Sequence, residues 1–266
     1  MMSTNFFEYA RVQHWYGRLR MLEEMLIKEN WQTNSDYSKN FTNPVLDNYI
    51  RYTAKRIFEL CNLYPDRAET WYLETDSSAI FNTGLFTPKY ERVYAVMYYD
   101  PQLDGRIWNF SGFYKESDKT LLQFSHLPAK AEYFEDVKDL VFNPRLDLRV
   151  NIGHILDDPN NLNRIPIALR EAANLQLVFE GALQMTRRRI EYDFKVATPS
   201  YYEQQIQFLL PIYLLGLDKP DIVLAVSNQG EFNYGHTCLT MDMAYSNARL
   251  LSPPTGWLAR EIVERV

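Results

Sequence analysis

Two histidines of the chain lie among residues that acid–base chemistry on a phosphodiester would need. His154 follows Asn151 in an Asn-x-x-His pattern, and His236 stands in a Gly-His-Thr sequence. One imidazole can accept a 2′-hydroxyl proton while the other protonates the leaving oxygen, and a cation stabilises the phosphorane charge. Lys195 and Arg249 are the candidates for that cation. This set defines one hypothesis, a metal-independent phosphodiesterase or nuclease with catalytic His154, His236 and Lys195.

The same histidines also fit structural roles. His236 could bond a backbone carbonyl at a strand edge, and His154 could organise a loop with Asn151. Neither histidine begins the H-x-[ST]-x pattern of two-histidine phosphoesterases, because His236 precedes Thr-Cys-Leu-Thr and His154 precedes Ile-Leu-Asp. The sequence therefore leaves open whether the chain is an enzyme.

A wider set of polar and aromatic residues is typical of RNA or nucleotide binding. The cations of the run Arg187–Arg189 could contact phosphates, or they could complement the dipole at the end of a helix. Tyr201 could stack on a base. Asn82, Thr83 and Gly84 could present N–H groups to an anion or form a plain turn. The candidate ligand-binding residues are Asn82, Thr83, Gly84, Asn151, Arg187, Arg189, Tyr201, Asn247 and Arg249.

Two roles are possible for the Arg249 side chain. It could clamp a phosphate in bidentate fashion, or it could pair internally with a carboxylate such as Asp242. Asn247 is two residues away, so the two side chains would share a face only in an extended turn, and not on a helix.

Composition and missing motifs exclude several function classes. The net charge of −6 excludes a broad basic coat for nucleic acid, although a local basic patch is compatible with it. No P-loop, Rossmann or nucleophile-elbow motif occurs, and no Cys/His cluster has zinc spacing. We expect no cofactor and no metal, and we expect Cys61 and Cys238 to be buried, reduced thiols. No signal peptide or membrane span is indicated, so we expect a cytoplasmic protein.

Hydrophobic periodicity predicts helices in the N-terminal quarter and strands after it. Residues 5–31 have the pattern of one amphipathic helix, and Asn43-Pro44 opens a second helix that ends at Pro65. Residues 71–114 alternate aromatic and β-branched positions between turn signals, including a turn at 101–105, which favours an antiparallel meander.

The second half mixes short helices, one long helix and a hairpin. A short helix is expected within EYFEDVKDLVF, a strand or loop edge in RVNIGHIL, and a loop over 157–166. Pro166 opens a long helix to about residue 194. Pro211 predicts that its strand is an edge strand or ends nearby. Asn228-Gln229-Gly230 joins a hairpin, DMAYSNARLL forms a short helix or turn, and the C-terminal tail is helical.

These elements predict one α+β domain over residues 1–266. A helical lead-in occupies residues 1–66, and a sheet-containing body occupies residues 67–266. The expected body is a mostly antiparallel sheet flanked by the N-terminal helices and by one long central helix.

Several segments together resemble a known family, the domain of unknown function 3825. They are FNTGL at 81–85, WNFSGF at 108–113, N-x-x-H at 151–154, K-x-A-x-P-x-Y-Y at 195–202, LLP at 209–211, and GHT followed by DMAYSNARL. The resemblance covers nearly the whole chain, and its closing block is the most specific part. Members of that family often follow cold-shock or OST-HTH RNA-binding modules, which implies an RNA-related role by association.

Our first hypothesis is therefore an RNA- or nucleotide-binding domain. The alternatives are the two-histidine phosphodiesterase and a non-catalytic protein-interaction or effector component. The expected partner is RNA or a nucleotide, with no membrane, and the oligomeric state is left open.

Overall fold

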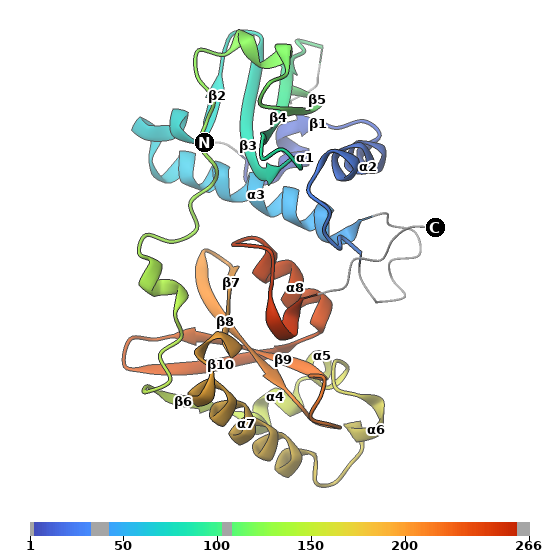
Figure 1. Ribbon diagram of the computed structural model, residues 1–266, viewed down its shortest axis with the longest axis vertical. Helices are drawn as coiled ribbons and strands as arrows, with labels where there is room; N and C mark the ends of the chain where they lie inside the picture. The colour runs from blue at the N-terminus through green and yellow to red at the C-terminus, as the bar shows by residue number, and fades with distance from the viewer. Residues whose placement is uncertain (1–2, 33–42, 103–107, 260–266) are drawn as a thin grey trace. The chain divides into compact units, whose positions relative to one another are not determined.

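The computed structural model describes residues 3–32, 43–102 and 108–259, and these residues form two compact units. Among them, the first unit ends at Glu132 and the second begins at Tyr133. Each unit has its own five-stranded sheet (Figure 1). The predicted α+β class is confirmed, with two mostly antiparallel sheets where one was expected. The single domain over 1–266 stays a prediction, and its expected internal division at 66/67 does not coincide with the division at 132/133.

The first unit begins with a broken helix, so the single helix predicted over residues 5–31 is wrong. Helix α1 (Phe6–Tyr9) gives way to strand β1 (Ala10–Arg11), and helix α2 (Trp15–Met25) follows. Strand β1 pairs in parallel with Trp108 and Asn109. His14 has a left-handed backbone, with φ of 53°, before α2 begins. Pairing with a distant strand outweighs local helix periodicity here, and no Gly or Pro marks the break.

The other elements of the first unit follow the prediction closely. Helix α3 (Pro44–Leu63) is followed by a 3-10 helix η2 (Pro65–Thr70). Strands β2 (Tyr72–Glu74), β3 (Ser78–Phe86), β4 (Arg92–Tyr99) and β5 (Trp108–Lys115) form the expected meander in the order β1-β5-β4-β3-β2. Short helix η3 (Lys119–Gln123) follows. The predicted turn at 101–105 lies largely outside the described residues.

Strand β3 contains an irregularity at the predicted Asn-Thr-Gly motif. The register against β4 shifts between Asn82 and Phe86, and Gly84 has φ of +73°. Asn82 is buried, donates to Pro128 O and accepts from the Gly84 N–H, while the Thr83 hydroxyl donates to Val93 O. The motif therefore uses its polar atoms to stabilise the strand.

The second unit contains the remaining elements. Short helix η4 (Val137–Leu140) precedes strand β6 (Asp147–Val150), and helices α4 (Ile152–Asp157), α5 (Pro159–Leu162), α6 (Ile167–Arg170) and α7 (Leu175–Tyr192) follow. Helix η5 (Phe194–Val196) leads to strands β7 (Thr198–Tyr202), β8 (Gln205–Ile212), β9 (Ile222–Asn228) and β10 (Phe232–Leu239). Helices α8 (Met241–Arg249) and η6 (Gly256–Leu258) close it.

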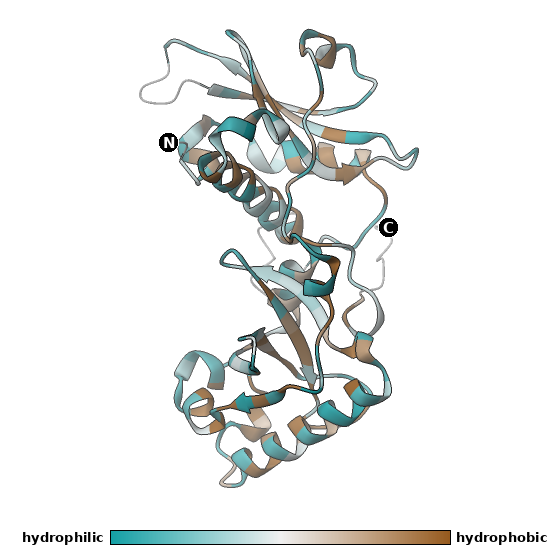
Figure 2. Ribbon diagram, turned by 90° about the vertical axis from the view of Figure 1, so that its left-hand side faces the viewer, coloured by the Kyte–Doolittle hydropathy of each residue, from teal (hydrophilic) through white to brown (hydrophobic). Residues whose placement is uncertain are grey.

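The second sheet, in the order β6-β10-β9-β8-β7, separates two layers of helices (Figure 1). Alternate residues of its strands, such as Leu210, Leu224 and Cys238, pack in one apolar cluster with Ile155 of α4 and Phe179 of α7. Their strand neighbours point the other way, because successive side chains alternate. Helix α8 packs on that second face, against β7, β9 and β10. Helices α3 and α7 show hydrophilic and hydrophobic positions side by side in Figure 2, as amphipathic helices do.

Two of the predictions for this unit need correction. The long helix expected from Pro166 to about residue 194 is divided into α6 and α7, with residues 171–174 between them. Arg170, the last residue of α6, donates to the carbonyls of Ile165 and Asn163 and so ties the end of α6 to the loop that precedes it. The loop expected over 157–166 contains α5, capped by the Asp158 side chain.

Pro211 predicted that its strand is an edge strand or ends nearby. Strand β8 lies between β9 and β7, so it is not an edge strand, but it ends one residue after Pro211. Pro211 pairs with Val223 on β9, whereas β7 reaches only as far as the partner of Leu209. Proline has no N–H to donate. At Pro211 no donor is needed on the side of β7, because β7 no longer pairs with β8 at that position. The hairpin of β9 and β10 and the short helix α8 are confirmed. The helical tail lies mostly outside the described residues, which show only η6.

The glycine in the Asn-Thr-Gly motif gives the first testable prediction. A Cβ at Gly84 would lie 2.8 Å from Tyr49 Oη, on a backbone that L residues rarely adopt. Gly84→Ala should lower the free energy of unfolding by about 1–3 kcal/mol. Gly17→Ala is the control in the same unit, because no atom lies within 4 Å of that Cβ on helix α2. Urea denaturation followed by circular dichroism measures both, and equal stabilities would contradict the prediction.

Candidate functional site

The candidate site is a row of three rings on strand β10, namely Phe232, Tyr234 and His236, hereafter the aromatic row. Phe232 and Tyr234 are half-buried and His236 is exposed. Phe232 and Tyr234 occupy alternate positions of one strand, so they project from the same face of the sheet. The rings of Tyr234 and His236 are 4.9 Å apart at 74°, an edge-on contact. This is the face on which α8 packs, opposite the α7 cluster.

A β-bulge positions His236. Gly235 pairs with Val226 and Thr237 pairs with Ala225, so His236 is an extra residue on β10. A bulge re-aims side chains and increases the local twist of a strand. Here it places the His236 ring on the same face as Tyr234, where it contacts Ser227 of β9.

A short chain of hydrogen bonds fixes the His236 ring. Gln229 Nε2 donates to Ser227 Oγ at 2.6 Å, and Ser227 Oγ lies 2.6 Å from His236 Nε2. The hydroxyl can accept from Gln229 and still either donate to Nε2 or accept from it, so this contact is compatible with both ring tautomers of His236. Partial burial also lowers the pKa of His236 below its usual 6.5.

Side chains from α5 and its following loop stabilise the edge of β10 next to the bulge. Strand β6 pairs with β10 only as far as Gly235, which leaves the edge beyond it without a strand. Asn161 Oδ1 accepts from the Cys238 N–H at 3.0 Å and from the Thr237 hydroxyl at 2.6 Å. Arg164 donates to Cys238 O. Each hydrogen bond contributes roughly 0.5–1.5 kcal/mol net, and a buried N–H left without one costs about 1–3 kcal/mol.

A cation stands at one end of the aromatic row. The Arg149 guanidinium lies 4.0 Å from the centroid of the Phe232 ring, and its Nε is 3.3 Å from an Asp147 carboxylate oxygen. Both Arg149 and Asp147 are exposed on strand β6. The surface therefore combines three neighbouring rings with one exposed arginine.

The two histidines of the acid–base hypothesis lie on different sides of the second sheet. His154 is exposed on α4, and its neighbour Ile155 is buried in the cluster that also holds α7. Asn151 caps that helix by accepting from the His154 N–H. His236 projects from the opposite face. Asn151 thus caps a helix, and the structure does not bring the two imidazoles together.

The arginine run does not form one patch. Arg187 donates to Leu148 O at 2.5 Å, while Arg189 donates to Leu217 O at 2.8 Å and lies 3.9 Å from the centroid of the Tyr213 ring. Arg188 is exposed. Lys195 is exposed in η5, where its N–H donates to the cap residue Asp193. The cations diverge around the end of α7, two of them bound to backbone carbonyls.

The remaining predicted ligand-binding residues are distributed among other elements. Tyr201 is buried on β7, with its ring 4.8 Å from that of Tyr133. Asn247 is half-buried and Arg249 is buried, both on helix α8, where residues two apart do not share a face. Asn82, Thr83 and Gly84 belong to the first unit. The twelve predicted residues are therefore not one site.

The described residues contain two buried cysteines but no metal-binding cluster and no membrane-spanning helix. Cys61 and Cys238 are free, buried thiols as predicted, and burial raises the pKa of Cys61 to about 11 and that of Cys238 to about 12. Across residues 3–32, 43–102 and 108–259, no cluster of three or more His, Cys, Asp or Glu could hold a metal ion. In the same ranges no helix has the length and apolar character needed to cross a membrane.

Sequence reasoning selected His236 and missed its neighbours. Phe232, Tyr234 and His236 recur at the period of two that a half-exposed strand requires, so the signal was present in the sequence. No sequence pattern indicated that Ser227 contacts His236 or that Asn161 bonds to β10. These contacts depend on the bulge in β10 and on the early end of β6.

The hydrogen-bonded ring of His236 gives a prediction about pH. We expect its titration midpoint, followed by NMR of the ring protons, to lie below 6.5. The folded pKa is lower than that of the unfolded chain, so the unfolded state binds more protons just below pH 6.5. The stability contribution is then complete above about pH 6.5 and is lost as the pH falls toward the folded pKa. A midpoint at or above 6.5 would show that the ring is not held neutral.

Comparison with known proteins places the chain in a family. No curated protein and no solved structure matches it. The family described as a domain of unknown function, DUF3825, matches residues 22–257, which is nearly the whole chain. The match includes both units and the aromatic row, and the chain therefore belongs to the DUF3825 family.

Proposed function

We propose that the second unit binds single-stranded RNA by stacking bases on the aromatic row. The observation that carries the proposal is the alignment of three rings at alternate positions of β10 on one face of the sheet. Phe232 and Tyr234 are two residues apart, roughly 6.6 Å along a strand, which allows two unstacked bases to lie on successive rings. The His236 ring lies edge-on to Tyr234 beside them. Sheets that present aromatic side chains in this way stack two or three RNA bases.

Electrostatics support stacking as the main source of affinity. The chain has a net charge of −6, and two arginines of α7, Arg187 and Arg189, are directed at carbonyls and away from a common surface. Arg149 is the exposed cation beside the row, and it can contact a phosphate or stack on a base. A single-stranded ligand fits this surface better than a duplex, whose bases are already stacked and paired.

Cleavage is a weaker proposal for the same surface. Two-histidine catalysis needs both imidazoles on one substrate, whereas His154 lies on a helix of the α7 layer and His236 projects from the other face. Nε2 of His236 is also in hydrogen-bond contact with the Ser227 hydroxyl. We therefore assign His236 a base-contacting role.

Substitutions in the aromatic row test the proposal. Phe232→Val and Tyr234→Val keep residues that favour strands and remove the rings. Each should weaken binding of a short single-stranded RNA by about 5- to 150-fold, because stacking contributes about 1–3 kcal/mol per base. Fluorescence anisotropy with a labelled oligonucleotide measures the affinity.

Tyr192→Val is the matched control. Tyr192 is an aromatic residue at the end of α7 with 94% of its surface exposed, outside the row. Its substitution should leave the affinity unchanged. A loss of binding in this variant alone would move the RNA surface to the end of α7, and normal binding by both row variants would reject the proposal.

Salt dependence gives a second test of the same surface. With one exposed arginine beside the row, the logarithm of the binding constant should fall shallowly with the logarithm of salt concentration. The slope is about 0.7 per phosphate contacted on a single strand. Arg149→Ala should reduce the slope by about that amount, while Arg188→Ala should not. A steep slope that Arg149→Ala leaves unchanged would indicate a different, more basic surface.

A further inference from the structure

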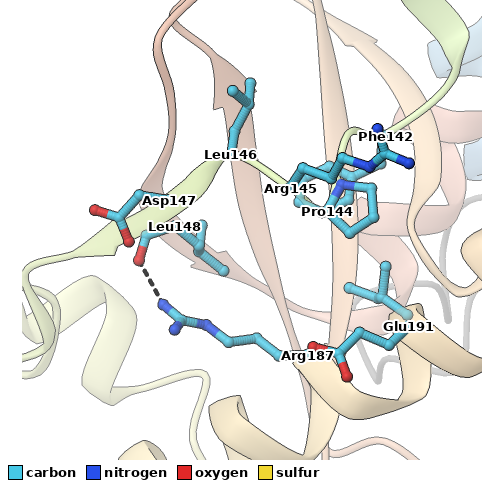
Figure 3. A pocket seen from close by; sticks show the side chains of 9 residues that line it. Phe142, Pro144, Arg145, Leu146, Asp147, Leu148, Arg187 and Glu191 are labelled. Atoms are coloured by element: carbon cyan, nitrogen blue, oxygen red, sulfur yellow. Dashed lines mark hydrogen bonds between the residues drawn. The ribbon is translucent and has the colours of Figure 1, made fainter.

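A separate pocket lies between the loop that precedes β6 and the last turns of helix α7 (Figure 3). Its volume is about 320 Å³, at the lower end of the range for small-molecule sites. Phe142, Pro144 and Ile190 supply apolar wall, and Arg187 and Glu191 supply polar groups from one side. Arg187 and Glu191 are four residues apart, so they lie one above the other on the same face of the helix.

Arg187 has an unused hydrogen-bond donor at this pocket. Its Nη2 donates to Leu148 O, as the dashed line in Figure 3 shows. Its Nε–H is buried and makes no hydrogen bond to any described residue. A buried, charged donor without a partner is rare in folded proteins, and an acceptor atom of a ligand or of water must satisfy it.

Glu191 adds the complementary acceptor. Its exposed carboxylate makes no ion pair or hydrogen bond within the described part of the chain, and its two oxygens can accept two neighbouring donors. A ligand that matches both side chains must present an acceptor beside a pair of donors on one edge, and it must be apolar on its faces.

We propose that this pocket binds a guanine base. The Watson–Crick edge of guanine carries O6 as an acceptor, followed by the N1–H and N2–H donors. Arg187 Nε–H would donate to O6, and the Glu191 carboxylate would accept from N1–H and N2–H. Adenine, cytosine and uracil each offer at most one donor group on that edge beside their acceptors. The pocket therefore selects guanine through the side-by-side donors.

This inference rests on the proposed function for the class of ligand, since it assigns a base specificity to an RNA-binding unit. It uses other residues, on the α7 side of the sheet. The two sites can therefore be tested separately.

The experiment is isothermal titration calorimetry of the full chain with GMP, IMP, AMP, CMP and UMP. GMP should bind most tightly. IMP lacks the N2 amino group, so its affinity should be about tenfold or more lower, as expected for one lost hydrogen bond to a charged group. Equal affinity for GMP and AMP, or no binding of GMP at millimolar concentration, would overturn the proposal.

Variants of the two polar residues locate the binding. Arg187→Met removes the donors and keeps an unbranched apolar stem, and Glu191→Gln keeps the shape and removes the charge. Each should weaken GMP binding by about tenfold or more, while Arg188→Met, on the exposed side of α7, should not. Arg187 also stabilises strand β6, so Glu191→Gln provides the test if Arg187→Met does not fold. Normal GMP binding by a folded Glu191→Gln protein would overturn the proposal.

Tyr234→Val separates this inference from the proposed function. It should weaken binding of an RNA oligonucleotide and leave GMP binding intact. If no oligonucleotide binds but GMP binds with the stated specificity, the RNA proposal fails and the pocket stands. If oligonucleotides bind through the aromatic row and GMP does not bind, the pocket assignment fails alone.

Discussion

The hydrogen bonds of Asn161 and Arg164 to strand β10 are the constraint on which the second unit depends. Strand β6 leaves the sheet after Val150, and the exposed backbone of β10 beyond that point needs new partners. Asn161 accepts from the Cys238 N–H, and Arg164 donates to the Cys238 carbonyl. Two side chains thus take the place of a neighbouring strand and close an edge that would otherwise be open to pairing.

This substitution for a strand has consequences on both faces of the sheet. Asn161 also accepts from the Thr237 hydroxyl, which fixes the residue that follows the bulge. His236 is consequently held on the face of Tyr234, within reach of Ser227. On the other face, Cys238 remains in the cluster that anchors α4 and α7. The hydrogen bonds of Asn161 therefore connect helix α5 to the part of β10 that carries the aromatic row.

The arginines of this unit show how sequence composition misleads about surface charge. Several donate to backbone carbonyls of strands or loops: Arg164, Arg170, Arg187 and Arg189. Such bonds stabilise irregular segments, because a buried carbonyl without a donor is costly. Two arginines of the run at 187–189 are thereby directed at the protein's own backbone, whereas Arg188 is exposed.

Sequence periodicity determined much of the local structure by itself. The meander over residues 71–114, helix α3 behind Asn43-Pro44, the hairpin at Asn228-Gln229-Gly230 and short helix α8 follow from turn residues and apolar spacing, which are local properties. The α+β class follows from the same patterns. The selection of His236 also came from the sequence alone.

Tertiary structure decided the rest, because the deciding contacts join residues far apart in the chain. Strand β1 interrupts the first helix through its pairing with Trp108 and Asn109, and Arg170 ties the end of α6 to the loop before that helix. The sheet places His154 and His236 on opposite sides, although both are histidines in polar contexts. The donor of Arg187 is left without a partner only because strand β6 takes its other nitrogen and the loop before β6 leaves a cavity. Sequence periodicity does not predict these contacts, because they depend on where a strand ends and on which of its carbonyls are left exposed.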